Sequence, residues 1–245
     1  MDLICSDLHA NLPAFKRLRR FIDVVKPAKI FILGDLVGYG ANPNEVVQEV
    51  QRLQGDYQTH VIHGNHDYIV MDPLIQFHFN DFAKQAILWT LNELTPENKQ
   101  YIQRLPSSLV DENVDYVHGS PTGNDDYILD NYDAMQAFKA MTSELGFFGH
   151  THLPGIISRK LGRIRRYYEA GKWITLDDWT HLVNPGSVGQ PRNKDPRASF
   201  CLHDPDLHRV RFVRLAYDVG AAQKAILDTK GKIPSWQAER LAGGR

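Results

Sequence analysis

The chain has 245 residues, a length that fits one large domain or two small ones. Its 28 Lys and Arg residues nearly balance its 29 Asp and Glu residues, so the formal net charge of −1 excludes a polyanion-coating surface and disfavours a nucleic-acid partner. Two cysteines cannot form a disulfide framework, and no apolar stretch is long enough to cross a membrane. We therefore expect a cytoplasmic protein with no membrane partner. The unusual feature of the composition is its 11 histidines.

Strands and helices are predicted to alternate in the first part of the chain. The apolar run 3–6 predicts a buried strand, and residues 13–25 repeat apolar side chains at helical spacing after Asn11, a good helix N-cap. A strand at 30–33, a helix at about 43–53 and a strand at about 59–62 follow. This order predicts right-handed crossovers and a parallel sheet.

The segment 67–109 interrupts this alternation and is interpreted as a helical insertion, with helical patterns at about 81–94 and 97–105. A strand at 114–117, a helix near 132–143 and a strand at 147–148 resume the alternation.

The character of the chain changes after residue 155. Short apolar runs separated by turn signals predict mostly antiparallel strands at 156–159, 164–169, 180–183, 198–203 and 209–215. A last helix is expected at about 219–228, before a polar C-terminal tail from about residue 230. Because no repeat or linker is visible, we predict a single domain over residues 1–245.

Five short polar motifs lie where a predicted strand ends. They are Asp7-Leu8-His9, Gly34-Asp35, Gly64-Asn65-His66-Asp67, His118-Gly119 and Gly149-His150-Thr151-His152. The 28 residues from Asp7 to Asp35 and the 30 from Asp35 to Asn65 each match one strand and its crossover. The carboxyl ends of parallel strands meet at one edge of a sheet, where ligands of open α/β folds bind. We therefore expect these side chains to gather at one site.

The donor atoms of these motifs suit divalent metal ions. Asp, Asn and His side chains provide oxygen and nitrogen ligands, which are typical of Mn, Fe, Zn, Co or Ni sites. The seven candidate ligands are too many for one ion, but a carboxylate shared between two ions would give each ion four protein ligands. The candidates are Asp7, His9, Asp35, Asn65, His118, His150 and His152. Two ions roughly 3.5–4 Å apart are a known arrangement for attack on phosphorus. The motifs thus favour phosphoryl hydrolysis.

Taken in order with their neighbours, the motifs resemble those of the calcineurin-like metallophosphoesterase superfamily. The chain is similar to its small bacterial and archaeal phosphodiesterase-like branch, which also carries the loop 184–189, Asn-Pro-Gly-Ser-Val-Gly. The resemblance covers about Asp2 to Leu215. It implies an α/β fold, an αββα sandwich of two packed mixed β-sheets flanked by helices, with a dinuclear metal site at the carboxyl ends of the strands.

The resemblance also implies a role for each motif residue. One metal would be held by Asp7, His9, Asp35 and His152, and the other by Asp35, Asn65, His118 and His150, with Asp35 bridging. His66 would be the general acid or the phosphate-stabilising group, and Asp67 would orient its ring. The cofactor would be two divalent ions, Mn before Fe, Zn, Ni or Co. The implied reaction is hydrolysis of a phosphate ester by a metal-bridging hydroxide.

Several features bear on the substrate, which we expect to be small and phosphorylated: a phosphodiester, a phosphomonoester or a dinucleoside polyphosphate. Arg192 could bind a phosphate bidentately, and the resemblance places Asn184 near the metals. Phe77 and Phe79 in the insertion are candidates for stacking on a nucleobase, which gives nucleotide-like substrates a slight preference.

Other interpretations of the same residues stay open. The metal site could serve a nuclease, a protein serine/threonine phosphatase or a mononuclear hydrolase, or belong to a catalytically idle metal-binding protein. Singly, Asp7 or Asp35 could simply cap a helix. Histidines outside the motifs are interpreted as packing or surface residues: His60, His63, His78, His181, His203 and His208. The oligomeric state is left open.

Overall fold

The structure is a computed structural model that describes residues 1–72, 74 and 81–245, without the side chains of Asp81 and Phe82. Its first sheet contains six strands in the order β3 (Thr59–Val61), β2 (Ile30–Ile32), β1 (Asp2–Cys5), β11 (Ala198–Asp204), β12 (Arg209–Leu215) and β9 (Trp173–Thr175). The strands β1, β2 and β3 are parallel, and the remaining pairs are antiparallel. The sheet is therefore mixed.

The second sheet also contains six strands, in the order β4 (Ser108–Asp111), β5 (Val114–Val117), β6 (Leu145–Phe147), β10 (Thr180–Asn184), β7 (Gly155–Lys160) and β8 (Arg163–Tyr167). The strand β6 runs parallel to both β5 and β10, and the other pairs are antiparallel. This sheet is mixed as well.

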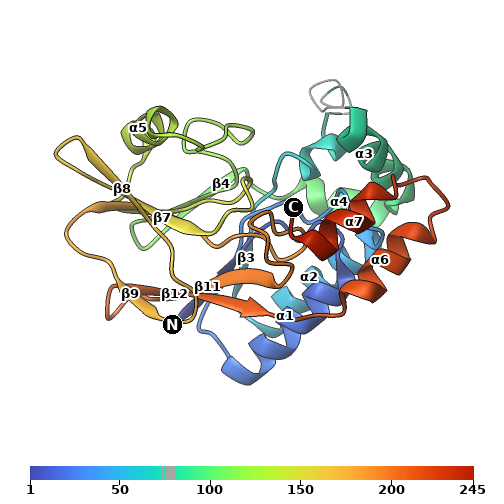
Figure 1. The fold of residues 1–245 in the computed structure, drawn as a ribbon, viewed down its shortest axis with the longest axis horizontal. Helices are drawn as coiled ribbons and strands as arrows, with labels where there is room; N and C mark the ends of the chain where they lie inside the picture. The colour runs from blue at the N-terminus through green and yellow to red at the C-terminus, as the bar shows by residue number, and fades with distance from the viewer. Residues whose placement is uncertain (73, 75–80) are drawn as a thin grey trace.

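The helices cover the outer faces of the two sheets. They are α1 (Leu12–Val25), α2 (Pro43–Asp56), α3 (Asp81–Glu93), α4 (Pro96–Gln103), α5 (Asn131–Ala140), α6 (Val219–Leu227) and α7 (Trp236–Gly243), with the short 3₁₀ helix η1 (Asp67–Val70). In Figure 1, α5 lies over the second sheet beside β7 and β8, whereas α1 lies on the opposite side, below β11. The predicted αββα sandwich is confirmed.

Alternation along each strand explains the layers. Leu3 and Cys5 of β1 pack with the apolar faces of α1 and α2, while Ile4 between them faces a second core between the sheets. Phe31 and Phe147 meet in this inter-sheet core. Successive side chains of a strand point to opposite faces, so a strand buried on both sides is apolar on both, as residues 3–5 are.

Besides the short 3₁₀ helix η1, three elements were not predicted. The strand β4 pairs with β5 through a tight turn at Glu112 and Asn113, which both have positive φ, and β9 joins the edge of the first sheet. The third is α7: residues after about 230 are expected to form a polar tail, but α7 buries Ala238 and Leu241. The structure differs from the expected polar tail: the apolar residues Trp236, Ala238, Leu241 and Ala242 fall within one eight-residue segment, which is too short for their helical period to be clear in the sequence.

Two further predictions concern particular segments. Within the segment 67–109, the structure has η1, α3 and α4, followed by the start of β4. Phe77, Phe79 and His78 lie outside the described residues. In the described part of the chain, no helix combines the length and the hydrophobicity needed to cross a bilayer.

Candidate metal centre

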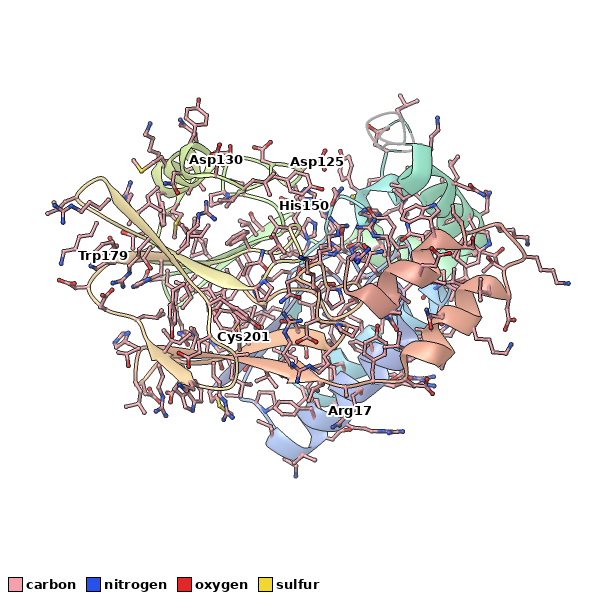
Figure 2. All side chains as sticks on the ribbon, viewed as in Figure 1. Arg17, Asp125, Asp130, His150, Trp179 and Cys201 are labelled. Carbon is pink, nitrogen blue, oxygen red and sulfur yellow. The ribbon has the colours of Figure 1, made fainter. Side chains whose placement is uncertain are left out.

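The predicted ligands follow the carboxyl ends of strands from both sheets. Asp7 and His9 follow β1, Asp35 follows β2, and Asn65 follows β3 in the first sheet. In the second sheet, His118 follows β5, and His150 and His152 follow β6. All seven side chains are buried, and Figure 2 shows His150 near the middle of the molecule. The two sheets thus bring all seven predicted ligands together.

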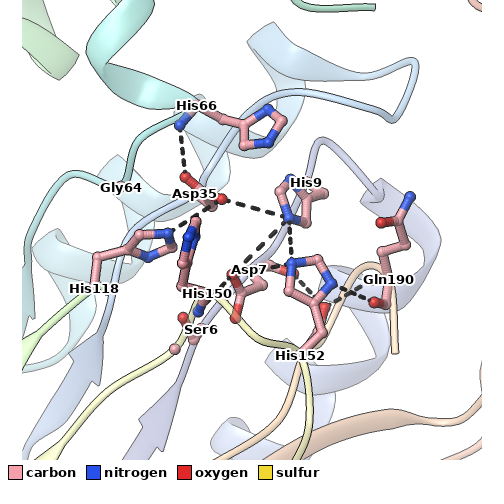
Figure 3. A network of polar contacts seen from close by, with 12 residues as sticks. Ser6, Asp7, His9, Asp35, Gly64, His66, His118, His150, His152 and Gln190 are labelled. Atoms are coloured by element: carbon pink, nitrogen blue, oxygen red, sulfur yellow. Dashed lines mark hydrogen bonds and ion pairs between the residues drawn. The ribbon is translucent and has the colours of Figure 1, made fainter. Parts of the chain in front are cut away.

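The first ligand cluster contains Asp7, His9, Asp35 and His152, whose donor atoms all lie within 4.8 Å of one another. The Nε2 atom of His9 lies 3.0 Å from the Nε2 atom of His152 and 3.6 Å from Oδ2 of Asp35. His152 Nε2 lies 3.4 Å from Oδ1 of Asp7. Figure 3 shows these four side chains converging on one point.

Backbone carbonyls set the tautomers of these histidines. His9 Nδ1 lies 3.1 Å from the carbonyl oxygen of Val37, and His152 Nδ1 lies 2.6 Å from that of Gln190. A carbonyl can only accept, so each Nδ1 carries the proton and each Nε2 presents a lone pair. Two lone pairs facing each other at 3.0 Å repel unless a cation lies between them. These residues could therefore hold a metal ion.

The second cluster contains Asp35, His118 and His150, again with donor atoms within 4.8 Å. His118 Nε2 lies 3.3 Å from Oδ2 of Asp35 and 3.1 Å from Oδ1 of Asn65, while its Nδ1 faces the carbonyl of Leu33 at 2.7 Å. The Nε2 atom of His150 is buried and has no hydrogen-bond partner among the described residues. Asp35 is common to both clusters, so the residues fit two ions with one shared carboxylate.

Five of the predicted ligands have a left-handed backbone: Asp7 (φ 56°), His9 (45°), Asp35 (51°), His150 (63°) and His152 (59°). This region is unfavourable for residues other than glycine, by ~1–2 kcal/mol each. Such strain persists only where the surrounding structure imposes it, and it concentrates at functional sites. Directing these side chains inward therefore lowers the stability of the fold.

Glycines allow close approach at two points of the site. A Cβ atom on Gly64 would lie 2.1 Å from Oδ1 of Asp35, and one on Gly38, where φ is 86°, would lie 2.4 Å from Nδ1 of His66. Both distances are far below any tolerated contact, so only glycine leaves room for these two side chains.

Asp67 holds two loops of the site together. Its carboxylate accepts hydrogen bonds from the backbone amides of Gly64 (2.9 Å), Leu36 (3.2 Å) and Val37 (3.2 Å). These bonds join the loop after β2 to the loop after β3. Asp67 therefore positions the loops that carry Asp35 and His66, and its orienting effect on the ring of His66 stays a prediction.

His66 lies at the edge of the first cluster. Its backbone amide donates to Oδ1 of Asp35 at 2.9 Å, and its ring lies 5.0 Å from that of His9 and 4.4 Å from that of Tyr39, between centroids. Burial lowers the pKa of His66 to about 4. The side chain is thus beside the ligands without belonging to either cluster.

The charges of the site reflect its burial. Burial raises the pKa of Asp7 to about 7 and lowers those of His9 and His152 well below the usual value. Burial also opposes charge on Asp35 and His118, but their mutual attraction outweighs it, lowering the pKa of Asp35 and raising that of His118 to about 9. His9 and His152 are therefore unprotonated at neutral pH, the form that binds metal ions.

The two predicted substrate-binding residues behave differently. Asn184 is buried, and its amide donates to the carbonyl of Gly149 (2.7 Å) and to Oγ1 of Thr151 (3.0 Å), while Oδ1 accepts from the amide of Gly186 (2.8 Å). These bonds brace the loop that carries His150 and His152. Asn184 is thus a positioning residue for this loop, and its contact with the substrate stays a prediction.

Arg192 points toward the centre. Its guanidinium lies 5.8 Å above the ring of Tyr39, one Nη atom donates to Oε1 of Gln190 at 3.1 Å, and its buried Nε has no hydrogen-bond partner among the described residues. The guanidinium retains a donor that an anion could accept.

Sequence reasoning missed three residues around the site. Tyr39 lies between His9 and His66, Tyr127 packs 3.9 Å from the ring of His150, and Gln190 holds both His152 and Arg192. Tyr39 follows the Gly34-Asp35 motif by four residues, and Gln190 directly follows the loop 184–189, so proximity to motifs could have identified both. No such signal marks Tyr127.

Comparisons with known proteins agree with this geometry. The family described as "Calcineurin-like phosphoesterase superfamily domain" matches residues 2–207. An uncharacterised protein of Methanocaldococcus jannaschii is 35% identical over 252 residues, covering 100% of this chain and 98% of that protein. The chain therefore belongs to the calcineurin-like phosphoesterase superfamily, and the family resemblance is confirmed.

Two solved structures share the whole architecture. A metallophosphoesterase from Sphaerobacter thermophilus is 35% identical with a TM-score of 0.86, and the match covers 100% of this chain and 98% of that one. A hypothetical protein from Pyrococcus horikoshii has 22% identity and a TM-score of 0.83, covering 100% and 99% of the two chains. At 22% identity, the similarity to the Pyrococcus horikoshii protein shows a shared fold and no more.

Proposed function

We propose that this protein is a dinuclear metal-dependent phosphoesterase that hydrolyses a small phosphate ester. The observation that carries the proposal is the pair of ligand clusters sharing Asp35. The orphaned buried atoms of the site, Oδ2 of Asp7, Oδ2 of Asp35 and Nε2 of His150, are those that two ions would bind. Asn65 would add its Oδ1 to the ligands of the second ion, beside Nε2 of His118.

When bound, two divalent ions supply the Lewis acidity that activates water and neutralises charge on the phosphate. The protein's own residues do the rest. His66, neutral because burial lowers its pKa, donates a hydrogen bond to the phosphate or to the leaving oxygen from its place beside His9. Arg192 binds a phosphate oxygen through its free Nε. Burial excludes water and strengthens both interactions.

The test is a hydrolysis panel of monoesters, diesters, cyclic nucleotides, dinucleoside polyphosphates and a phosphoserine peptide, with Mn or other divalent ions and with a chelator. Hydrolysis that needs the ions and is abolished by the chelator supports the proposal. Two tightly bound ions with no hydrolysis would instead indicate an idle metal-binding protein. One ion per chain at full activity would indicate a mononuclear hydrolase.

The role of His66 is tested by His66→Ala, with His208→Ala, an exposed histidine remote in sequence, as the matched control. The former should keep two ions and lower kcat by ~10²–10⁴-fold, while the control should match the wild type. An unchanged rate in His66→Ala removes this residue from the mechanism.

Mn as the preferred ion, a nucleotide-like substrate and cytoplasmic location are parts of the same proposal. The nuclease alternative makes a separate prediction: binding to DNA that collapses between low and moderate salt. The protein phosphatase alternative predicts that the phosphoserine peptide is the best substrate of the panel.

A further inference from the structure

An apolar cavity borders the loop that carries His150 and His152. Its volume is about 290 Å³, close to that of the smallest ligand pockets, roughly 300 Å³. Thr151, which lies between the two histidines in the chain, lines the cavity, and so does Leu153, which directly follows His152. The other walls come mainly from the segment before α5 and from β7 and β8. The cavity and the candidate metal centre therefore share this loop as a common wall.

Tyr127 connects the cavity with the metal centre. Its ring centroid lies 3.9 Å from that of His150, yet 45% of the residue is exposed. Leu129, two residues further along the chain, lines the cavity. Figure 2 shows Asp125 and Asp130, which flank this segment, above His150. Tyr127 thus extends an exposed aromatic surface from a candidate metal ligand toward the cavity.

Exposed apolar side chains gather around the cavity. Leu129 is 61% exposed, Leu153 44%, Tyr167 45% and Tyr168 39%, and all four line the cavity. A single exposed apolar residue is ordinary, but a cluster of them beside a pocket marks a binding surface. Because apolar surface is unfavourable in water, this cluster favours an apolar ligand group over solvent.

The charge of the lining indicates which part of a substrate fits the cavity. Among the described residues that line it, Arg166 alone is charged, and its guanidinium donates to the carbonyl of Asp130 at 2.5 Å. A guanidinium and tyrosine rings such as those of Tyr167 and Tyr168 pack well against a planar ring. The metal centre suits a phosphate, whereas the neighbouring cavity suits an aromatic group attached to it.

We propose that this cavity, here called the aromatic subsite, binds an aromatic ring in the organic part of the phosphate ester while the phosphate lies at the metals. The substrate class is then an ester that carries such a ring, in preference to small alkyl phosphates. This inference rests on the proposed phosphoesterase function, which it narrows. It makes Tyr127 and Leu129 specificity-determining residues.

The test compares binding of methylphosphonate and 2-phenylethylphosphonate, which share one phosphonate group and resist hydrolysis. Calorimetric titration of the Mn-loaded chain should show tighter binding of the phenylethyl compound by ~10-fold or more, equivalent to ~1.4 kcal/mol, because its ring leaves water. Leu129→Asp places a carboxylate at the cavity and should remove most of this preference, and Leu129→Ala should remove part of it. Since both ligands carry the same phosphonate, the effect of the new charge on that group cancels in the ratio of their affinities.

The matched control is Leu207→Asp, which introduces the same charge at a leucine of similar exposure, 56%, in the turn between β11 and β12. It should keep the wild-type preference. No preference in the wild type, or an unchanged preference in Leu129→Asp, overturns the proposal, as does an equal loss in the control. Sedimentation adds a second measurement: a dimer that Leu129→Asp dissociates, with the preference intact, assigns the cavity to a second copy of the chain and also overturns the proposal.

The aromatic subsite and the proposed function can fail separately. If no ester is hydrolysed but the preference and its loss in Leu129→Asp are observed, the proposed function fails and the aromatic subsite stands. If esters are hydrolysed but the phenyl group brings no preference, the proposed function stands and the aromatic subsite fails.

Discussion

The substitution Asp7→Asn should stabilise the metal-free protein while abolishing its stabilisation by metal ions. Asp7 is fully buried, and its Oδ2 has no hydrogen-bond partner among the described residues, whereas Oδ1 accepts from the amide of His150 at 3.2 Å. An asparagine oxygen can keep this last bond. The substitution therefore removes a buried charge that only a cation would compensate.

The magnitude follows from the cost of an unsatisfied buried polar group, ~1–3 kcal/mol and more when the group is charged. In a chain of this size, this corresponds to a rise in melting temperature of roughly 2–10 °C without metal. For the wild type, a divalent ion at 100 times its Kd should add ~2.7 kcal/mol, and the variant should lose most of this gain.

The assay is thermal unfolding followed by circular dichroism, with chelator and with Mn, together with elemental analysis of bound ions. Asp67→Asn is the matched control, because Asp67 is equally buried but its carboxylate accepts three backbone hydrogen bonds. It should lower the free energy of unfolding by ~1–3 kcal/mol, and the melting temperature with it. If Asp7→Asn lowers the metal-free melting temperature as Asp67→Asn does, or still gains stability from Mn, the assignment of Asp7 to a metal is refuted.

Three further predictions concern other residues. Asp35→Asn should hold fewer than two ions by elemental analysis, because Asp35 is shared by both clusters; two retained ions would exclude a bridging role. Asn184→Ala should weaken metal binding ~10–100-fold in a chelator competition, because it releases the loop of His150 and His152; unchanged affinity would contradict this. Burial lowers the pKa of His203 to about 4, below its unfolded value of ~6.5, so stability falls as the pH drops through this window. His203→Gln should remove ~3 kcal/mol of that fall in unfolding titrations, and an unaltered pH dependence would count against it.

The sequence by itself identified the residues that gather at the candidate metal centre, because each of them follows its strand within a few residues. In a strand–helix–strand unit, the direction of parallel strands is set by chain order, so Asp7, Asp35 and Asn65 reach one sheet edge from local patterns alone. The same holds for most element boundaries, such as α1 with its cap Asn11, whose Oδ1 accepts from Ala14.

Tertiary structure alone decided how these residues are used. Whether Asp67 bonds a ring or three amides, and whether Asn184 faces a substrate or a loop, depends on segments far apart in the chain. The Nε2 atoms of His9 and His152 meet across 143 positions, and Gln190 reaches Gln237 across 47. The position of α7 beside the metal centre follows from burial of Ala238 and Leu241 against other elements. No local period or turn signal encodes such contacts, because they exist only once the two sheets and their loops have packed.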